Sequence, residues 1–154
     1  MLDVSQPLTF VGNDLNVDKY LFLFRPVRIY LAAPYSINSL NTANVKQFNF
    51  EQVSKVASNL MQKNHIVFSP VSHSHPIQIY GKLETNDLAF WMTQDLPFVE
   101  FCDVLCVLML PGWDASPGVK REMEHAMKFK KDIYYLEFKN DEVIFYELEK
   151  FTKW

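Results

Sequence analysis

Glycine and cysteine are both scarce in this chain of 154 residues. Its four glycines are Gly12, Gly81, Gly112 and Gly118. Their spacing forms neither the G-x-G-x-x-G fingerprint of dinucleotide-binding folds nor the G-x-x-x-x-G-K-[ST] phosphate loop. The only two cysteines, Cys102 and Cys106, are too few for a disulfide scaffold and poorly placed for a bridge. We therefore expect free buried thiols and, if phosphate is bound, a binding site without a glycine-rich loop.

The sequence also lacks basic clusters and long apolar runs. Its 15 basic and 18 acidic residues are mixed along the chain, for a net charge of -3, so no surface for polymeric DNA or RNA is expected. The longest apolar run, Val104–Pro111, is far shorter than the roughly 18 residues of a membrane span. Asp3 stands where a signal peptide carries positive charge. We expect a cytoplasmic protein that does not bind membranes.

The apolar pattern predicts an N-terminal extension over residues 1–26 and one domain over 27–154. Strands are expected at 27–32, 66–68, 104–110 and 133–138, and helices at 41–63, 86–101 and 119–129. The helix over 86–101 is expected to be interrupted or restarted at Pro97, and Ser69–Leu83, with two prolines and no helical period, to be a long loop. This alternation predicts a single-domain, doubly wound α/β fold with a mostly parallel sheet and helices on both faces.

Ligands of such folds bind beyond the carboxyl ends of the strands, where the strand order reverses. Three segments are expected to meet there: 32–36, 69–75 and 111–118. The helix that follows carries Glu122 on the same stripe as Val119, Met123 and Ala126, so a carboxylate occupies a core-facing position near the helix start. Glu122 is therefore a candidate catalytic residue; the alternative is a boundary glutamate that reaches water or stabilises the helix dipole.

A second carboxyl, Asp95, shares an apolar stripe with Leu88, Trp91, Met92 and Val99. It is a candidate partner of Glu122 in acid–base chemistry. The alternative is structural, because an aspartate two residues before Pro97 can cap a restarted helix.

The sequence Ser116-Pro117-Gly118 is typical of a helix start, with a serine cap, a proline in the first turn and a small residue. Free N–H groups there bind anions, and the serine hydroxyl is a further donor. Ser36 ends the turn after the first strand and is a candidate for contacting the same anion. Serine caps are frequent and most of them bind nothing, so the alternative for both serines is a purely structural role.

The remaining polar and aromatic candidates are less specific. His73 and His75 form an H-x-H pair without further metal-ligating residues at a recognisable spacing, which favours substrate hydrogen bonding over a metal site. Tyr30, Trp91 and Trp113 are candidate site residues for which core packing is the ordinary alternative.

Several motifs resemble the nucleoside 2-deoxyribosyltransferase superfamily. They are IYLAAPYS (29–36), SPVSHSHP (69–76), W-x-x-x-D-L (91–96), the pair at 102–103, and LPGWDASPGVKRE (110–122). Within that superfamily the chain is most similar to an uncharacterised bacterial and phage branch, and it also resembles the 2′-deoxynucleoside 5′-monophosphate N-glycosidases. The resemblance spans residues 27 to about 138 and implies a flavodoxin-like, deoxyribosyltransferase-like fold without metal or organic cofactor.

The resemblance also implies roles for individual residues. Glu122 matches the family's nucleophile, Asp95 the aspartate that serves the departing base, and Tyr30 the tyrosine that contacts the nucleophile. The position six before the glutamate is Ser116, as in the monophosphate hydrolases, whereas transferases of free nucleosides have aspartate there. A serine donates to phosphate where an aspartate would repel it. Substrate contacts are expected from Ser116, Gly118, Ser36, His73, His75, Trp91 and Trp113.

The combined prediction is an N-glycosidase that releases the base from a (deoxy)nucleoside 5′-monophosphate, with Glu122 ionised and Asp95 protonated through a raised pKa. One alternative is a deoxyribosyltransferase that exchanges bases. Another is a nucleotide-binding or sensor protein without turnover. The substrate is a small nucleotide or nucleoside in each case, and family members are commonly homodimers or larger assemblies.

Overall fold

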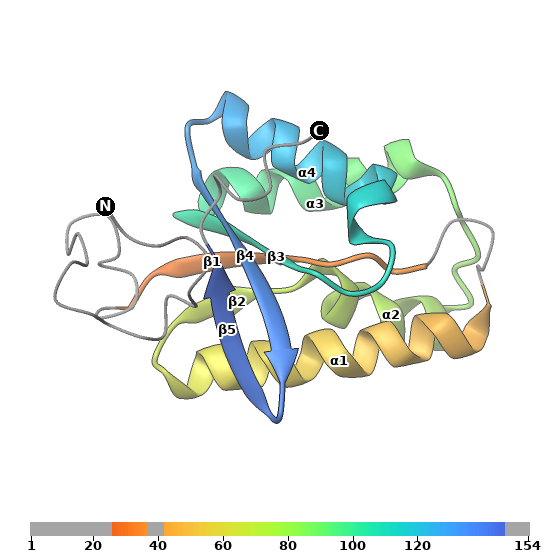
Figure 1. Cartoon of the computed structure of the whole chain (residues 1–154). Coiled ribbons are helices and arrows are strands. Elements are labelled where there is room, and N and C mark those ends of the chain that lie inside the picture. Colours follow the sequence, from red (N-terminus) through yellow and green to blue (C-terminus); the bar gives the residue numbers. More distant parts are fainter. Residues whose placement is uncertain (1–25, 37–41, 147–154) are drawn as a thin grey trace, which may run out of the picture.

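One five-stranded sheet forms the centre of the molecule (Figure 1). The structure is a computed structural model and describes residues 26–36 and 42–146. The strands are β1 (Arg28–Ala32), β2 (Ile66–Phe68), β3 (Val104–Leu108), β4 (Asp132–Lys139) and β5 (Glu142–Tyr146). They lie in the order β2-β1-β3-β4-β5, with β5 antiparallel to β4 and the other neighbours parallel. The predicted α/β fold with a mostly parallel sheet is confirmed.

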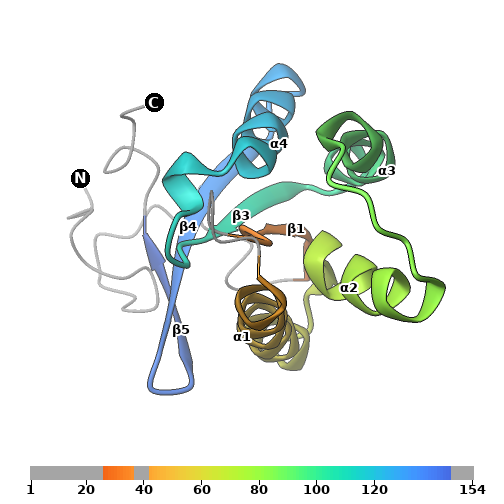
Figure 2. The ribbon, with the colours of Figure 1, turned by 90° about the vertical axis from the view of Figure 1, so that its right-hand side faces the viewer.

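Helices cover both faces of this sheet. They are α1 (Ala43–Gln62), α2 (Pro70–Gly81), α3 (Leu88–Phe101) and α4 (Pro117–Lys128), with a short 3-10 helix, η2 (Trp113–Ala115), before α4. Figures 1 and 2 show α1 and α2 on one side of the sheet and α3 and α4 on the other. Over residues 26–36 and 42–146, no helix is long and apolar enough to cross a lipid bilayer.

Alternate residues of each strand enter two separate cores. In β1, Ile29 and Leu31 pack on the α1 side, whereas Tyr30 enters the core beneath α3 and α4. The two cysteines follow the same division: Cys106 lies in the first core and Cys102 in the second, and both are buried and free. The expectation of buried free thiols is confirmed, because the sheet separates the two side chains.

The segment Ser69–Leu83 is the clearest correction to the sequence-based fold. It was expected to be a loop, but most of it forms α2. Pro70 stands in the first turn, where a proline needs no donor, and the serine before it caps the helix by accepting from a backbone N–H at 3.1 Å. The second proline is tolerated inside a helix that packs against α1, where His75 stacks on Phe50 with ring centroids 4.4 Å apart. Tertiary packing thus outweighs proline's low helix propensity.

Helix α3 differs from expectation in a similar way, because it continues through Pro97 without a restart. Asp87 is its N-cap and accepts a hydrogen bond from the N–H of Ala89 at 3.0 Å. Asp95 therefore lies in the middle of α3, and the capping role considered for it is excluded.

The final strand, β5, was not expected as a strand. It returns along β4 through Asn140 and Asp141, which both have positive φ, at 51° and 61°. Such a two-residue turn suits the twist of a hairpin. Val143 and Phe145 point into the core and alternate with partly exposed or exposed residues, which is the period of two that a strand with one buried face shows. The predicted extension at residues 1–26 lies almost wholly outside the described residues.

Candidate active site

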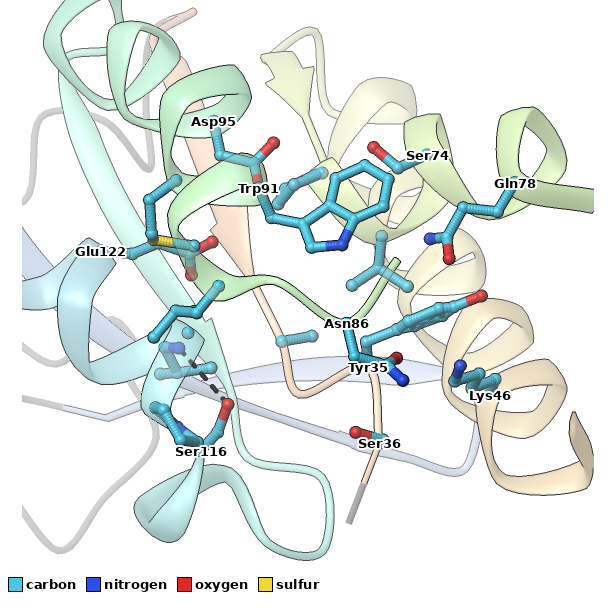
Figure 3. A pocket seen from close by; sticks show the side chains of 18 of the residues that line it. Tyr35, Ser36, Lys46, Ser74, Gln78, Asn86, Trp91, Asp95, Ser116 and Glu122 are labelled. Carbon is cyan, nitrogen blue, oxygen red and sulfur yellow. Dashed lines mark hydrogen bonds between the residues drawn. The ribbon is translucent and has the colours of Figure 1, made fainter. Parts of the chain in front are cut away.

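A pocket of about 430 Å³ opens at the carboxyl ends of β1 and β3, where the strand order reverses (Figure 3). This volume is sufficient for a small organic ligand. All three segments expected there contribute: Ser36 from the turn after β1, Val71 from the start of α2, and Ser116 from the start of α4. Side chains of α1 and α3 complete the wall. The predicted convergence of these segments is confirmed.

Glu122 is the most deeply buried of the charged side chains that line the pocket. It lies on the buried stripe of α4 with Val119 and Met123 and is only 4% exposed. Its Oε1 accepts a hydrogen bond from the hydroxyl of Tyr30 at 2.7 Å. Its Oε2 is buried and has no hydrogen-bond partner in the described part of the chain. One oxygen is thus held by Tyr30, while the other is buried without a hydrogen bond to the described residues.

Tyr30 supports Glu122 from beneath the pocket. It lies in the middle of the sheet, paired with Phe68 of β2 and Leu105 of β3, and is fully buried. Burial, with the charge of Glu122 second, raises its pKa well above the usual value, so the hydroxyl keeps its proton. Tyr30 is therefore a fixed donor toward Glu122.

Asp95 supplies the second carboxyl. It lies on the buried side of α3 with Met92 and Val99, lines the pocket and is 7% exposed. It makes no hydrogen bond or ion pair with another residue in the ranges 26–36 and 42–146. Burial raises the pKa of Asp95 to about 6. This carboxyl therefore takes up a proton at a higher pH than an ordinary aspartate does.

The pKa of Glu122 is raised further, to about 8. Burial is the main cause, the hydrogen bond from Tyr30 opposes it, and the nearby charge of Asp95 adds to it. The expected division, with Glu122 ionised and Asp95 protonated, is thus not the favoured state of the protein by itself. The two carboxyls titrate as a pair, and the form with the proton on Asp95 is the minor one near pH 7.

The start of α4 contributes a small set of donors. The Ser116 Oγ accepts from the N–H of Val119 at 3.3 Å, which leaves the serine proton available. Pro117 has no N–H, and the N–H of Gly118 makes no hydrogen bond with the described residues. A Cβ added to Gly118 would meet the Met92 Cε at 3.9 Å, so packing alone does not require glycine. At the start of α4, within the described residues, the hydroxyl of Ser116 and the N–H of Gly118 are thus the donors available to an anion.

Trp91 also lines the pocket, and its position is fixed because its indole N–H donates to the backbone oxygen of Thr85 at 3.1 Å. Three other residues predicted to contact the substrate, His73, His75 and Trp113, do not line the pocket. His73 is exposed, and Trp113 is half-buried with its ring 5.4 Å from that of Tyr135. His75 is buried against α1. Because α2 is a helix, both histidines turn away from the pocket, and no role in substrate contact is proposed for these three residues.

His75 nevertheless supports the pocket wall. Its Nε2 donates to Gln47 Oε1 at 3.0 Å, since the amide of Gln47 donates to Glu51 and leaves that oxygen as the acceptor. The Nδ1 then accepts from the hydroxyl of Tyr35, whose side chain lines the pocket. Burial, with Lys46 second, lowers the pKa of His75, which keeps the ring neutral.

Sequence reasoning missed several polar residues of the wall. These are Tyr35, Lys46, Ser74, Gln78, Thr85 and Asn86. Two of them, Ser74 and Gln78, lie on the same face of α2 as Val71. A predicted helix over residues 70–81 would therefore have placed both at the pocket. The sequence around Lys46 contains no pattern that places this lysine at the pocket. Within the described ranges, no group of three or more His, Cys, Asp or Glu residues is arranged to hold a metal ion.

Comparison with known proteins identifies the family. The family model of DUF1937, a domain of unknown function, matches residues 27–137. The chain belongs to the DUF1937 family. This match includes every described residue that lines the pocket, from Ala33 to Glu122.

The DUF1937 chain also shares its fold with a solved structure. That protein is a 2-deoxyribosyltransferase from the psychrotolerant bacterium Bacillus psychrosaccharolyticus. The TM-score is 0.51 at 22% sequence identity, over 73% of the DUF1937 chain and 74% of the other chain. A search of curated proteins gives no significant match. At this level of identity the likeness establishes the fold of the DUF1937 domain.

The geometry of the DUF1937 site predicts the effect of Tyr30→Phe on titration. The variant loses a hydrogen bond that favours the ionised form of Glu122, so the pKa of Glu122 should rise above that of the wild type. Loss of this buried hydrogen bond should also cost about 1–3 kcal/mol of stability. Carbon-13 NMR of the side-chain carboxyl measures the titration. Tyr80→Phe, at an exposed tyrosine, is the control, and an unchanged pKa in Tyr30→Phe contradicts the assigned hydrogen bond.

Proposed function

We propose that this protein hydrolyses the N-glycosidic bond between the base and the (deoxy)ribose 5-phosphate of a nucleoside monophosphate. One observation carries the proposal: Glu122 is buried with one oxygen held by Tyr30 and the other without a protein partner, in a pocket that also contains Asp95. A carboxylate held in this way suits attack on an electron-deficient carbon. A buried carboxyl with a raised pKa suits proton donation to a leaving group.

The proposed reaction has two steps. An oxygen of ionised Glu122 attacks the anomeric carbon, C1′, as the C1′–N bond breaks and its electron pair passes to the base. Asp95 donates its proton to the departing base. Water then attacks C1′ of the glycosyl ester and gives a proton to Asp95, which releases the sugar phosphate and restores the Glu122 carboxylate. The positive charge that develops on the sugar favours ionised Glu122, which offsets its raised pKa.

The start of α4 supports a phosphorylated substrate. Ser116 and the N–H of Gly118 are neutral donors at a helix N-terminus, where an anion is stabilised. Both lie in the same pocket as Glu122, and on the same helix. A 5′-phosphate bound there would leave the sugar within the pocket, toward the carboxyls.

Chromatography of a nucleotide panel tests the proposed function. The panel contains the common deoxynucleoside and ribonucleoside monophosphates, the matching nucleosides, NAD and ADP-ribose. The proposal predicts free base and sugar phosphate from at least one monophosphate. Formation of a new nucleoside or nucleotide when a second free base is added would instead show base transfer. Thermal stabilisation by nucleotides without any released base would show a binding protein.

The substitution Ser116→Asp is expected to act on phosphorylated substrates alone. Both residues can cap α4, but the aspartate adds a negative charge where the phosphate is proposed to bind. We expect kcat/KM for the monophosphate to fall about 100-fold, with little change for the matching nucleoside. Ser116→Asn is the matched control, since asparagine caps the helix without adding charge. Equal losses for nucleotide and nucleoside would contradict a phosphate site at Ser116.

A further inference from the structure

The pocket contains one positive group, at a distance from its two carboxyls. Of the residues that line it in the described part of the chain, Lys46 of α1 is the only lysine or arginine. Figure 3 shows Glu122 and Lys46 on opposite sides of the pocket. The pocket therefore has an acidic end and a basic end.

The basic end is built on a fixed aromatic wall. The Nζ of Lys46 lies 5.2 Å from the centre of the Tyr35 ring. Tyr35 is itself fixed, since its hydroxyl donates to His75 and its backbone oxygen accepts from the side chain of Asn49 at 3.2 Å. Lys46 forms no ion pair with an acidic residue over 26–36 and 42–146. Its charge is thus positioned by the protein but not neutralised by it.

Two further polar side chains lie at this end, Ser74 and Gln78 of α2. Neither side chain makes a hydrogen bond within the described residues. A hydroxyl, a carboxamide and an ammonium therefore remain available to a ligand. All three groups can donate hydrogen bonds, and a carbonyl oxygen of a ligand can accept them.

We propose that Lys46 is a specificity-determining residue that binds a ring carbonyl oxygen of the departing base, so that the preferred substrates carry oxo-substituted bases such as hypoxanthine or uracil. This inference rests on the hydrolysis proposed above. The start of α4 already provides donors for the phosphate, and Lys46 lies on another helix across the pocket. The base is thus the part of the substrate assigned to Lys46.

The chemistry of the leaving group explains why a cation is useful there. When the C1′–N bond breaks, the electron pair passes to the ring nitrogen and is shared with the ring carbonyl oxygens. An ammonium group at such an oxygen stabilises the transition state more than the intact substrate, because the negative charge is still developing. The proton from Asp95 then neutralises the released base. Adenine has no ring carbonyl and gains nothing from Lys46.

The test compares wild type with Lys46→Met on the deoxynucleoside monophosphates of hypoxanthine, uracil and adenine. Methionine keeps the unbranched side chain and removes the charge. We expect base release to fall about 10- to 100-fold for the two oxo-bases and less than about threefold for adenine. Lys46→Arg should retain most of the activity. Lys55→Met is the matched control, at an exposed lysine of α1 outside the pocket.

Two results would overturn the assignment of Lys46. One is an equal loss for all three bases. The other is a loss that affects monophosphates but not the matching nucleosides, which would place the phosphate at Lys46. If wild type releases no base from any nucleotide, the proposed function fails separately. Equilibrium binding of free hypoxanthine and adenine then decides the inference, because Lys46→Met must weaken binding of hypoxanthine alone.

Discussion

Glu122→Gln is expected to reduce base release by about 10³- to 10⁵-fold. The amide has nearly the same shape as the carboxyl and can still accept the hydrogen bond from Tyr30, but it cannot form the glycosyl ester. The loss should appear in kcat, with substrate binding retained. Chromatography of released base, with the monophosphate that wild type cleaves best, measures the effect.

The same variant should be more stable than wild type at alkaline pH. The pKa of Glu122 is about 8 in the folded protein and about 4.5 ordinarily, so the folded state holds a proton that the unfolded chain releases between these values. The stability contributed by protonated Glu122 is therefore fully present below pH 4.5 and is lost as the pH rises through 8. Glutamine has no charge to bury, and above pH 8 its gain in unfolding free energy is on the order of 5 kcal/mol.

Glu122→Gln is thus expected to lose activity but to gain stability, and urea unfolding at pH 5 and pH 9 tests the gain in stability. The free energy of unfolding of the variant should exceed that of wild type mainly at pH 9. Glu124→Gln is the matched control, because Glu124 is the neighbouring exposed glutamate of α4. A Glu122→Gln protein that keeps its activity, or whose relative stability is the same at both pH values, contradicts the account of this residue.

Asp95→Asn is expected to lower base release by about 10²- to 10⁴-fold, since asparagine has no acidic proton to donate. The loss should depend on the leaving group. A substrate whose leaving group departs without protonation should be cleaved by the variant almost as fast as by wild type in the first turnover. Single-turnover rates with natural and activated leaving groups make this comparison.

The control for this variant is Asp87→Asn on the same helix. Asp87 is the exposed N-cap of α3, and asparagine caps helices equally well. It should leave both rates unchanged. If Asp95→Asn slows natural and activated substrates equally, Asp95 does not act as the proton donor.

The parts of the site that lie on α3 and α4 could be predicted from the sequence. The spacing of Val119, Glu122 and Met123 fixes one helical face, and that face remains buried in the structure. The serine–proline start of α4 was equally informative, because capping depends on local chemistry. The mostly parallel sheet followed from the alternation of apolar segments, which requires crossover helices.

The rest of the site depends on contacts between distant segments. Helix α2 contains Pro76, and only packing against α1 reveals that the segment is helical, which is why His73 and His75 were assigned to the pocket and Ser74 was missed. The sequence also gives no indication that the pKa of Glu122 is higher than that of Asp95. This difference follows from the burial of Glu122, which is 4% exposed and lies near the charge of Asp95.

Trapping of the covalent intermediate tests the central claim most directly. A nucleoside monophosphate with fluorine at C2′ should react slowly, because the fluorine destabilises positive charge at C1′. Mass spectrometry of the quenched protein should then show the fluorinated sugar phosphate attached to the peptide that contains Glu122. The account is contradicted if base is released while the adduct lies on another residue, or if no adduct forms at Glu122.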